Sequence, residues 1–128
     1  MKKYILLLLI PVSFFLYKTL MKDTTVTIPP SNFKSKIEKN HDATILDVRT
    51  AGEFSEGHLE NALNIDWNES DFDQKIEKIN KKTTIFVYCQ SGGRSSSAVS
   101  HLHDLGYKNI FELDGGISSW QTEGLPVQ

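Results

Sequence analysis

The chain contains a single cysteine, Cys89, and the residues after it combine two glycines with an arginine. Residues 88–95 read Tyr-Cys-Gln-Ser-Gly-Gly-Arg-Ser. The glycines Gly92 and Gly93 let the backbone curl with its N–H groups turned inward, and Arg94 adds a fixed positive charge. Surroundings of this kind can lower a thiol pKa from about 8.5 into the range of about 3.5–7.5. The pattern therefore predicts a nucleophilic thiolate at Cys89, activated without a histidine base.

Two predicted elements flank this loop and position the sulfur. Residues 84–88 (TIFVY) are β-branched or aromatic and predict a strand, and residues 95–105 predict a helix that stops at Gly106. Cys89 would then lie at the carboxyl end of a strand and before a helix N-terminus, where anions bind. Such a site could hold an anionic substrate or the outer sulfur of a persulfide formed on Cys89. The loop residues expected to line it are Gln90, Ser91, Gly92, Gly93 and Ser95.

Strands and helices alternate at short intervals in the rest of the chain. The further helices are expected at residues 31–39, 50–56, 70–79 and 115 onward, and the further strands at residues 43–48, 62–65 and 109–113. This alternation predicts an α/β fold with a small parallel sheet and helices on both faces.

An apolar segment precedes this domain. Residues 1–3 carry two lysines, and residues 4–17 contain no charge, which is the layout of a secretory signal peptide. An uncleaved membrane anchor over residues 4–21 is the alternative, because such a stretch approaches the roughly 20 residues that span a bilayer. We therefore divide the chain into a signal peptide or anchor (1–22), a threonine- and proline-rich linker (23–30) and a folded domain (31–128). Either segment places the domain outside the cytoplasm, in the periplasm or cell envelope.

Charge and cysteine content exclude several functions. The chain has a formal net charge of −2, and without its first 22 residues the balance becomes ten basic against sixteen acidic residues. A domain so acidic lacks the basic surface that nucleic-acid binding requires. One cysteine forms no intrachain disulfide and no paired-cysteine zinc site. We expect no metal here, and the interpretation of the chain given below implies no organic cofactor.

Three separated motifs resemble the single-domain rhodaneses, a sulfurtransferase family. Cys89, Gly92, Arg94 and Ser95 match the C-x-x-G-x-R-S pattern of the family's active-site loop. An upstream L-D-V-R, E-[FY] and G-H-I signature is matched by Leu46–Arg49, Glu53, Phe54 and Gly57–Leu59, and a closing L-x-G-G, W and G-x-P-V segment by Leu113–Gly116, Trp120, Gly124, Pro126 and Val127. Asn61 stands where a glycine is common, which is tolerable because asparagine can adopt a left-handed conformation.

The resemblance implies a function and a set of residue roles. Cys89 would attack the outer sulfur of an anionic donor such as thiosulfate and form a persulfide, which cyanide, a small thiol or a protein thiol then discharges. The backbone amides of residues 90–95 would hold that sulfur, and Arg94 would close the loop. Asp47 and Arg49 belong to the family signature and are interpreted as mainly architectural, near the site. We expect the domain to be a monomer.

Two other functions remain open. A non-catalytic binding module could keep the fold and present a partner surface. A cysteine phosphatase or arsenate reductase also uses a strand, loop and helix, but with five residues between the cysteine and the arginine where this chain has four.

Overall fold

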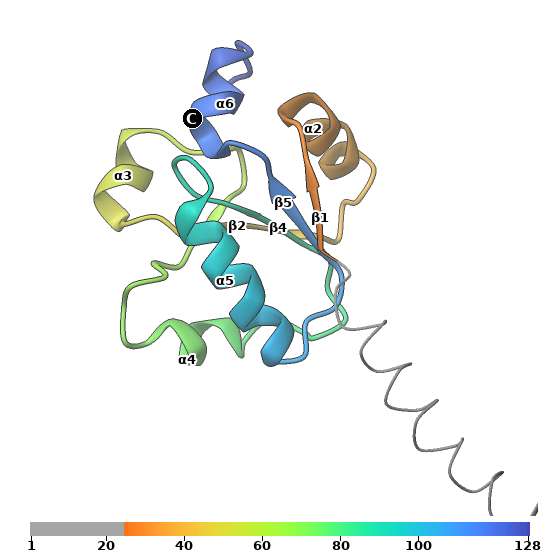
Figure 1. The fold of residues 1–128 in the computed structure, drawn as a ribbon, viewed down its shortest axis with the longest axis vertical. Helices are drawn as coiled ribbons and strands as arrows, with labels where there is room; N and C mark the ends of the chain where they lie inside the picture. The colour runs from red at the N-terminus through yellow and green to blue at the C-terminus, as the bar shows by residue number, and fades with distance from the viewer. Residues whose placement is uncertain (1–24) are drawn as a thin grey trace, which may run out of the picture.

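The structure is a computed structural model that describes residues 25–128 and contains one five-stranded parallel sheet in the order β1-β5-β4-β2-β3 (Figure 1). The strands are β1 (Thr25–Ile28), β2 (Thr44–Asp47), β3 (Leu63–Asn64), β4 (Ile85–Tyr88) and β5 (Ile110–Leu113). The helices are α2 (Pro30–Glu38), α3 (Ala51–Glu56), α4 (Phe72–Ile76), α5 (Gly93–Asp104) and α6 (Gly116–Thr122). The predicted signal peptide or anchor at residues 1–22 lies outside the described residues. Within residues 25–128, no helix combines the length and apolar character needed to cross a bilayer.

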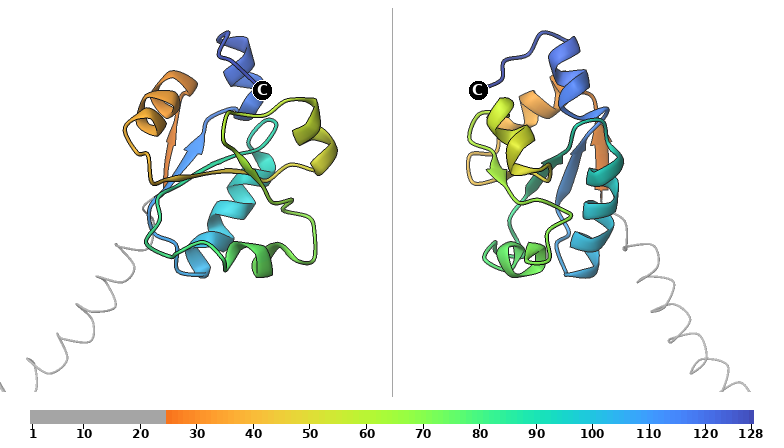
Figure 2. Two further views of the ribbon diagram at one scale, coloured as in Figure 1. Left: turned by 180° about the vertical axis from the view of Figure 1, so that it is seen from behind. Right: turned by 90° about the vertical axis from the view of Figure 1, so that its left-hand side faces the viewer.

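Alternate side chains of the strands pack into two hydrophobic cores, one on each face of the sheet. In β4, Ile85 and Val87 pack with α4 and α5, whereas Phe86 and Tyr88 pack with α2 and α6. The helices accordingly cover both faces (Figure 2). All four side chains of β4 are fully buried, as expected for a central parallel strand. The predicted α/β architecture is confirmed.

The predicted linker at residues 23–30 is wrong over five of its residues, the four of β1 and Pro30, where α2 begins. Thr25–Ile28 form β1, an edge strand that pairs in parallel with β5 in the register Thr25↔Ile110 to Ile28↔Leu113. The threonines that suggested a linker are β-branched and suit an edge strand, whose outer side faces solvent. Ile28 is 8% exposed and joins the core beneath α2 and α6.

Several helix boundaries also differ from the prediction. The first helix begins at Pro30 rather than behind a Ser31 cap, because the fixed φ of proline suits the first helical position. The helix after the cysteine begins at Gly93, so Ser95 lies within its first turn. The helix predicted over 70–79 is only Phe72–Ile76. As predicted, Asn61 is left-handed, with φ 63°.

Replacing Ile28 with alanine tests whether β1 is part of the fold. We expect Ile28→Ala to lower the free energy of unfolding by about 2 kcal/mol, because it empties a buried position. Val26→Ala is the matched control, since Val26 is 47% exposed on the same strand and its loss should stay within about 0.5 kcal/mol. Urea denaturation measures both values. Equal, small effects would mean that residues 25–28 act as a linker.

Candidate active site

Cys89 lies where the sheet changes its direction of winding. The strands β2 and β4 are neighbours, and the chain leaves β2 toward β3 but leaves β4 toward β5, on opposite sides. Ligands of open α/β sheets bind at such a switch point, outside the carboxyl ends of the strands. Cys89 follows β4 directly, and Asp47 ends β2 beside it. The sequence-predicted residues 89–95, called the cysteine loop below, and the Asp47–Arg49 turn therefore meet at one edge of the sheet.

The sulfur of Cys89 is enclosed by its own loop. The side chain is 1% exposed, and Sγ accepts a hydrogen bond from the Gly92 N–H at 3.0 Å. The Ser95 Oγ lies 3.3 Å from Sγ, one turn into α5. Gly92 has φ 116°, a left-handed conformation that turns its N–H inward and that a side chain would strain.

These contacts favour the thiolate of Cys89 over the thiol. Burial raises the pKa of the Cys89 thiol, but hydrogen bonds from the Ser95 hydroxyl and from the backbone N–H groups of Ser95, Gly92 and Ser91 lower it. The net result is a pKa below the ordinary value. The predicted activation by the loop amides therefore has a structural basis.

Helix α6 holds the carbonyl side of the cysteine loop. The Ile117 N–H donates to the Cys89 carbonyl at 2.9 Å, and the Ser118 N–H donates to the Gln90 carbonyl at 3.0 Å. Because these carbonyls are bound by α6, the N–H groups of the following residues are free to face the sulfur. Gly116 permits the approach, since a Cβ there would lie 2.5 Å from the Gln90 carbonyl carbon and oxygen.

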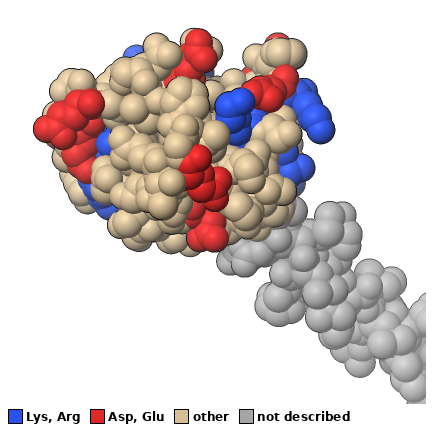
Figure 3. Space-filling model, turned by 90° about the horizontal axis from the view of Figure 1, so that it is seen from above, with Lys and Arg blue, Asp and Glu red and all other residues tan. Residues whose placement is uncertain are grey.

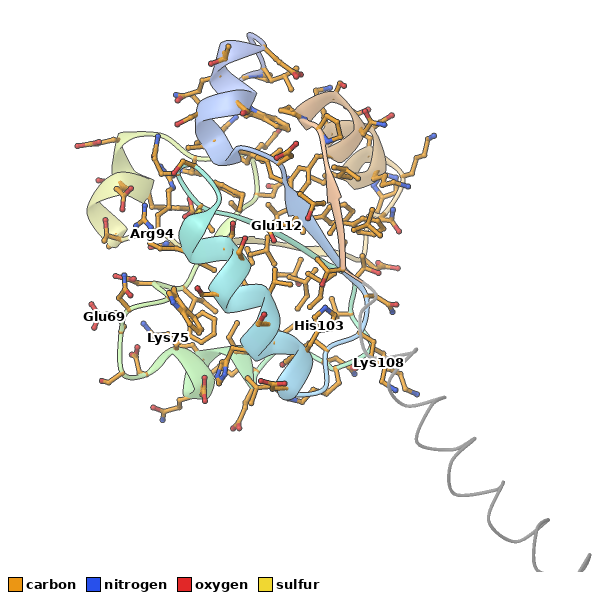
Figure 4. All side chains as sticks on the ribbon, in the orientation of Figure 1. Glu69, Lys75, Arg94, His103, Lys108 and Glu112 are labelled. Carbon is orange, nitrogen blue, oxygen red and sulfur yellow. The ribbon has the colours of Figure 1, made fainter. Side chains whose placement is uncertain are left out.

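Arg94 forms a salt bridge with Glu53 across the site, and its charge also interacts with that of the Cys89 thiolate. Its Nη1 and Nη2 donate to Oε1 and Oε2 of Glu53 at 2.6 and 2.9 Å, so the guanidinium joins α5 to α3 (Figure 4). Glu53 also forms a capping box with Thr50 at the start of α3. The sequence prediction that Arg94 closes the loop agrees with this geometry, but its partner Glu53 was not identified as a site residue.

Asp47 and Arg49 form a buried ion pair that supports the loop. Arg49 donates from Nε and Nη2 to the Asp47 carboxylate, with the Nη2 bond at 2.7 Å. A third donor nitrogen of Arg49, Nη1, reaches the Gln90 Oε1 at 3.2 Å, and Gln90 in turn donates from Nε2 to the Ser118 hydroxyl at 3.0 Å. Removing one member of such a pair leaves an uncompensated buried charge. The pair therefore has the architectural position that the sequence predicted for it.

Sequence reasoning missed Glu112, a buried acidic residue behind the loop. Glu112 is 6% exposed on β5, and its Oε1 accepts from the hydroxyls of Ser95 at 3.2 Å and Ser96 at 2.9 Å. Its strand position pairs with Val87, on the face covered by α5. The sequence feature that could have identified Glu112 is a lone charged residue inside an apolar strand. Burying such a charge costs free energy unless it is hydrogen-bonded.

Other possible ligand sites lie away from Cys89. Among residues 25–128, no group of three or more histidine, cysteine, aspartate or glutamate side chains is arranged to hold a metal ion. A cavity of about 580 Å³ opens between α2, the β2–β3 edge and Trp120, and no residue of the cysteine loop lines it.

Residues 29–123 match the family model of the Rhodanese-like domain. The chain belongs to this family. It is 36% identical over 93 residues to thiosulfate sulfurtransferase 16, chloroplastic, of Arabidopsis thaliana, which covers 65% of this chain and 78% of that protein. It is 29% identical over 100 residues to a sulfurtransferase of Allochromatium vinosum, covering 78% of this chain and 92% of that protein. A crystal structure of a rhodanese-related protein from Thermoplasma volcanium superposes with a TM-score of 0.70 at 34% identity, over 80% of this chain and 97% of that one.

Gly116 is a position where this rhodanese-like domain has no room for a side chain, because backbone atoms of the cysteine loop lie too close. We expect Gly116→Ala to destabilise the domain by about 2 kcal/mol or more, because its Cβ would meet rigid backbone atoms. Gly93→Ala is the control, since a Cβ at Gly93 meets nothing within 4 Å and should change stability by at most about 1 kcal/mol. Thermal unfolding of both variants measures the difference. Equal destabilisation would contradict the role of α6 in holding the loop.

The salt bridge between Arg94 and Glu53 makes acid stability depend on Glu53. The hydrogen bond from Arg94 lowers the Glu53 pKa from 4.5 to about 2. A carboxylate with a lowered pKa stabilises the fold above its unfolded-state pKa and loses that contribution as the pH falls. Between pH 4.5 and about 2, wild-type stability should therefore fall more steeply than that of Glu53→Gln. Parallel stability curves in urea titrations would show that the bridge contributes nothing.

Proposed function

We propose that the protein is a sulfurtransferase that carries sulfane sulfur as a persulfide on Cys89. The observation that carries the proposal is the enclosed sulfur, which accepts the Gly92 N–H at 3.0 Å and whose pKa the loop hydrogen bonds lower. Membership of the rhodanese-like family and similarity to proteins named as sulfurtransferases support the same function.

The proposed reaction balances without an external oxidant or reductant. The Cys89 thiolate attacks the outer sulfur of thiosulfate, an S–S bond forms at Cys89, and sulfite leaves with the electron pair of the broken bond. A thiolate acceptor or cyanide then attacks the terminal sulfur, and Cys89 leaves as the thiolate. The amides that favour a negative charge at Sγ also favour one on the terminal sulfur.

Loop size favours sulfur transfer over phosphate or arsenate chemistry. Four residues separate Cys89 from Arg94. In addition, both guanidinium nitrogens bonded to Glu53 are committed to that carboxylate. A tetrahedral oxyanion needs a wider ring of amides and free positive charge, whereas one sulfur atom needs neither.

Charges are scattered on the end of the domain seen from above. Figure 3 shows acidic groups together with lysine and arginine side chains in small mixed groups, with mostly uncharged surface between these groups. No broad basic field marks this view as a surface for large polyanions. We propose a small sulfur-containing anion as donor, a low-molecular-weight or protein thiol as acceptor, and an exported location for the domain, with residues 1–22 as signal peptide or anchor.

The direct test is sulfur loading followed by intact-mass spectrometry. The reduced full chain is treated with thiosulfate or a polysulfide, and we expect a gain of one sulfur atom that disappears when cyanide is added. Cys89→Ser should gain nothing, because the serine hydroxyl is neither a comparable nucleophile nor a stable carrier of sulfur.

Ser97→Ala is the matched control for that experiment. Ser97 is an exposed residue of α5, so its variant should load sulfur as the wild type does. A wild-type chain that takes no sulfur from either donor would overturn the proposal and favour a binding module.

A further inference from the structure

Ser95 contacts three groups that can accept its one hydroxyl proton. Its Oγ lies 3.3 Å from the Cys89 Sγ and 3.2 Å from both the Glu112 Oε1 and the Gly92 carbonyl oxygen. The Gly92 carbonyl does not depend on this proton, because it also accepts the Ser96 N–H at 3.1 Å. A serine hydroxyl has one O–H donor and two acceptor lone pairs. When Cys89 is a thiol, its S–H donates to Ser95 and the Ser95 O–H donates to Glu112, so Cys89, Ser95 and Glu112 are all satisfied.

Loss of the Cys89 proton removes this arrangement. The thiolate has no hydrogen and accepts only, and the Glu112 carboxylate accepts only. Of these two anions, the Ser95 proton can then serve only one, Sγ or Glu112, and the other loses this hydrogen bond inside the protein; the third acceptor, the Gly92 carbonyl, is the same in both cases. Cys89 is 1% exposed and Glu112 is 6% exposed. Water therefore replaces little of the lost hydrogen bonding at either group.

Ser96 makes this competition adjustable. Its hydroxyl, on the exposed side of α5, lies 2.9 Å from the same Glu112 oxygen and 2.9 Å from the Gly92 carbonyl oxygen, so it can donate to either. With the Ser96 bond in place, Glu112 has a second donor and can release the Ser95 proton. Without that bond, Glu112 depends on Ser95 alone.

We propose that Glu112 is a positioning residue that competes with the Cys89 sulfur for the Ser95 hydroxyl proton and so sets how strongly the cysteine loop holds a sulfur anion. Ser96 opposes this effect, because its hydroxyl gives Glu112 a second hydrogen-bond donor. The importance of Glu112 for turnover rests on the proposed sulfurtransferase function, but the competition itself is a property of the unloaded protein.

The remaining charged groups near Cys89 are paired among themselves. On the α3 side, Glu53 binds Arg94, and the negative charges of the Cys89 thiolate and of Asp66 also act on Arg94. On the β2 side, Asp47 binds Arg49. These groups stay in place in every variant used below, so differences between variants report Glu112 and its two serines.

The experiment follows alkylation of Cys89 by iodoacetamide against pH in the reduced full chain. Since only the thiolate reacts, the midpoint of the rate profile reports thiolate formation. Glu112→Gln keeps an acceptor oxygen but removes the negative charge. We expect it to lower the midpoint by about one pH unit, which raises the alkylation rate about tenfold at pH values below the midpoint. An unchanged midpoint would overturn the proposal.

Ser95→Ala distinguishes competition for the proton from simple charge repulsion. In the Ser95→Ala background, Glu112→Gln should shift the midpoint much less, because the shared hydroxyl is gone. An equal shift in both backgrounds would show that the Glu112 charge acts through space, and would overturn the proposal.

Ser96→Ala gives a prediction of opposite sign that does not depend on altering Glu112. Ser96 is exposed and alanine favours helices, so this variant should fold. Its midpoint should rise, because Glu112 then holds the Ser95 proton more tightly, and a fall or no change would overturn the proposal.

Thiosulfate loading is measured separately. Wild-type chain that fails to load while the predicted midpoint shifts occur would refute the proposed function and leave the competition established.

Discussion

The site depends on one close contact, that between the N-terminus of α6 and the carbonyls of Cys89 and Gln90. A peptide unit directs its C=O and N–H in opposite directions, so fixing two carbonyls outward commits the loop to an inward set of amides. The absence of a Cβ at Gly116 makes this approach sterically possible. Sulfur binding by the loop is thus a consequence of packing between two segments, and neither segment provides it alone.

Salt bridges around the loop act as supports and not as a positive field. The Asp47–Arg49 pair and the Glu53–Arg94 pair each cancel most of their own charge. What remains to stabilise a sulfur anion is a set of fixed dipoles: backbone N–H groups, one hydroxyl and the first turn of α5. Fixed dipoles of this kind need little reorganisation when charge develops.

Local patterns predicted much of the fold, and long-range pairing explains what they missed. The apolar run of β4, the glycine after α5 and the cysteine loop itself were visible because their signals are contiguous. The strand β1 was not, because its partner β5 lies about 85 residues away, as in the register Thr25↔Ile110, and its own threonines and following prolines resemble a linker. Glu112 was missed for a similar reason, since only the folded chain brings it to Ser95.

Parallel strands give the domain a direction. All strands begin at one end of the sheet and finish at the other, and Thr25 starts β1 while Cys89 follows the end of β4. Thr25, the first residue that the structure describes, therefore lies at the pole opposite the sulfur. A domain held at a surface through that pole would present the Cys89 end outward, toward a partner thiol in the surrounding medium.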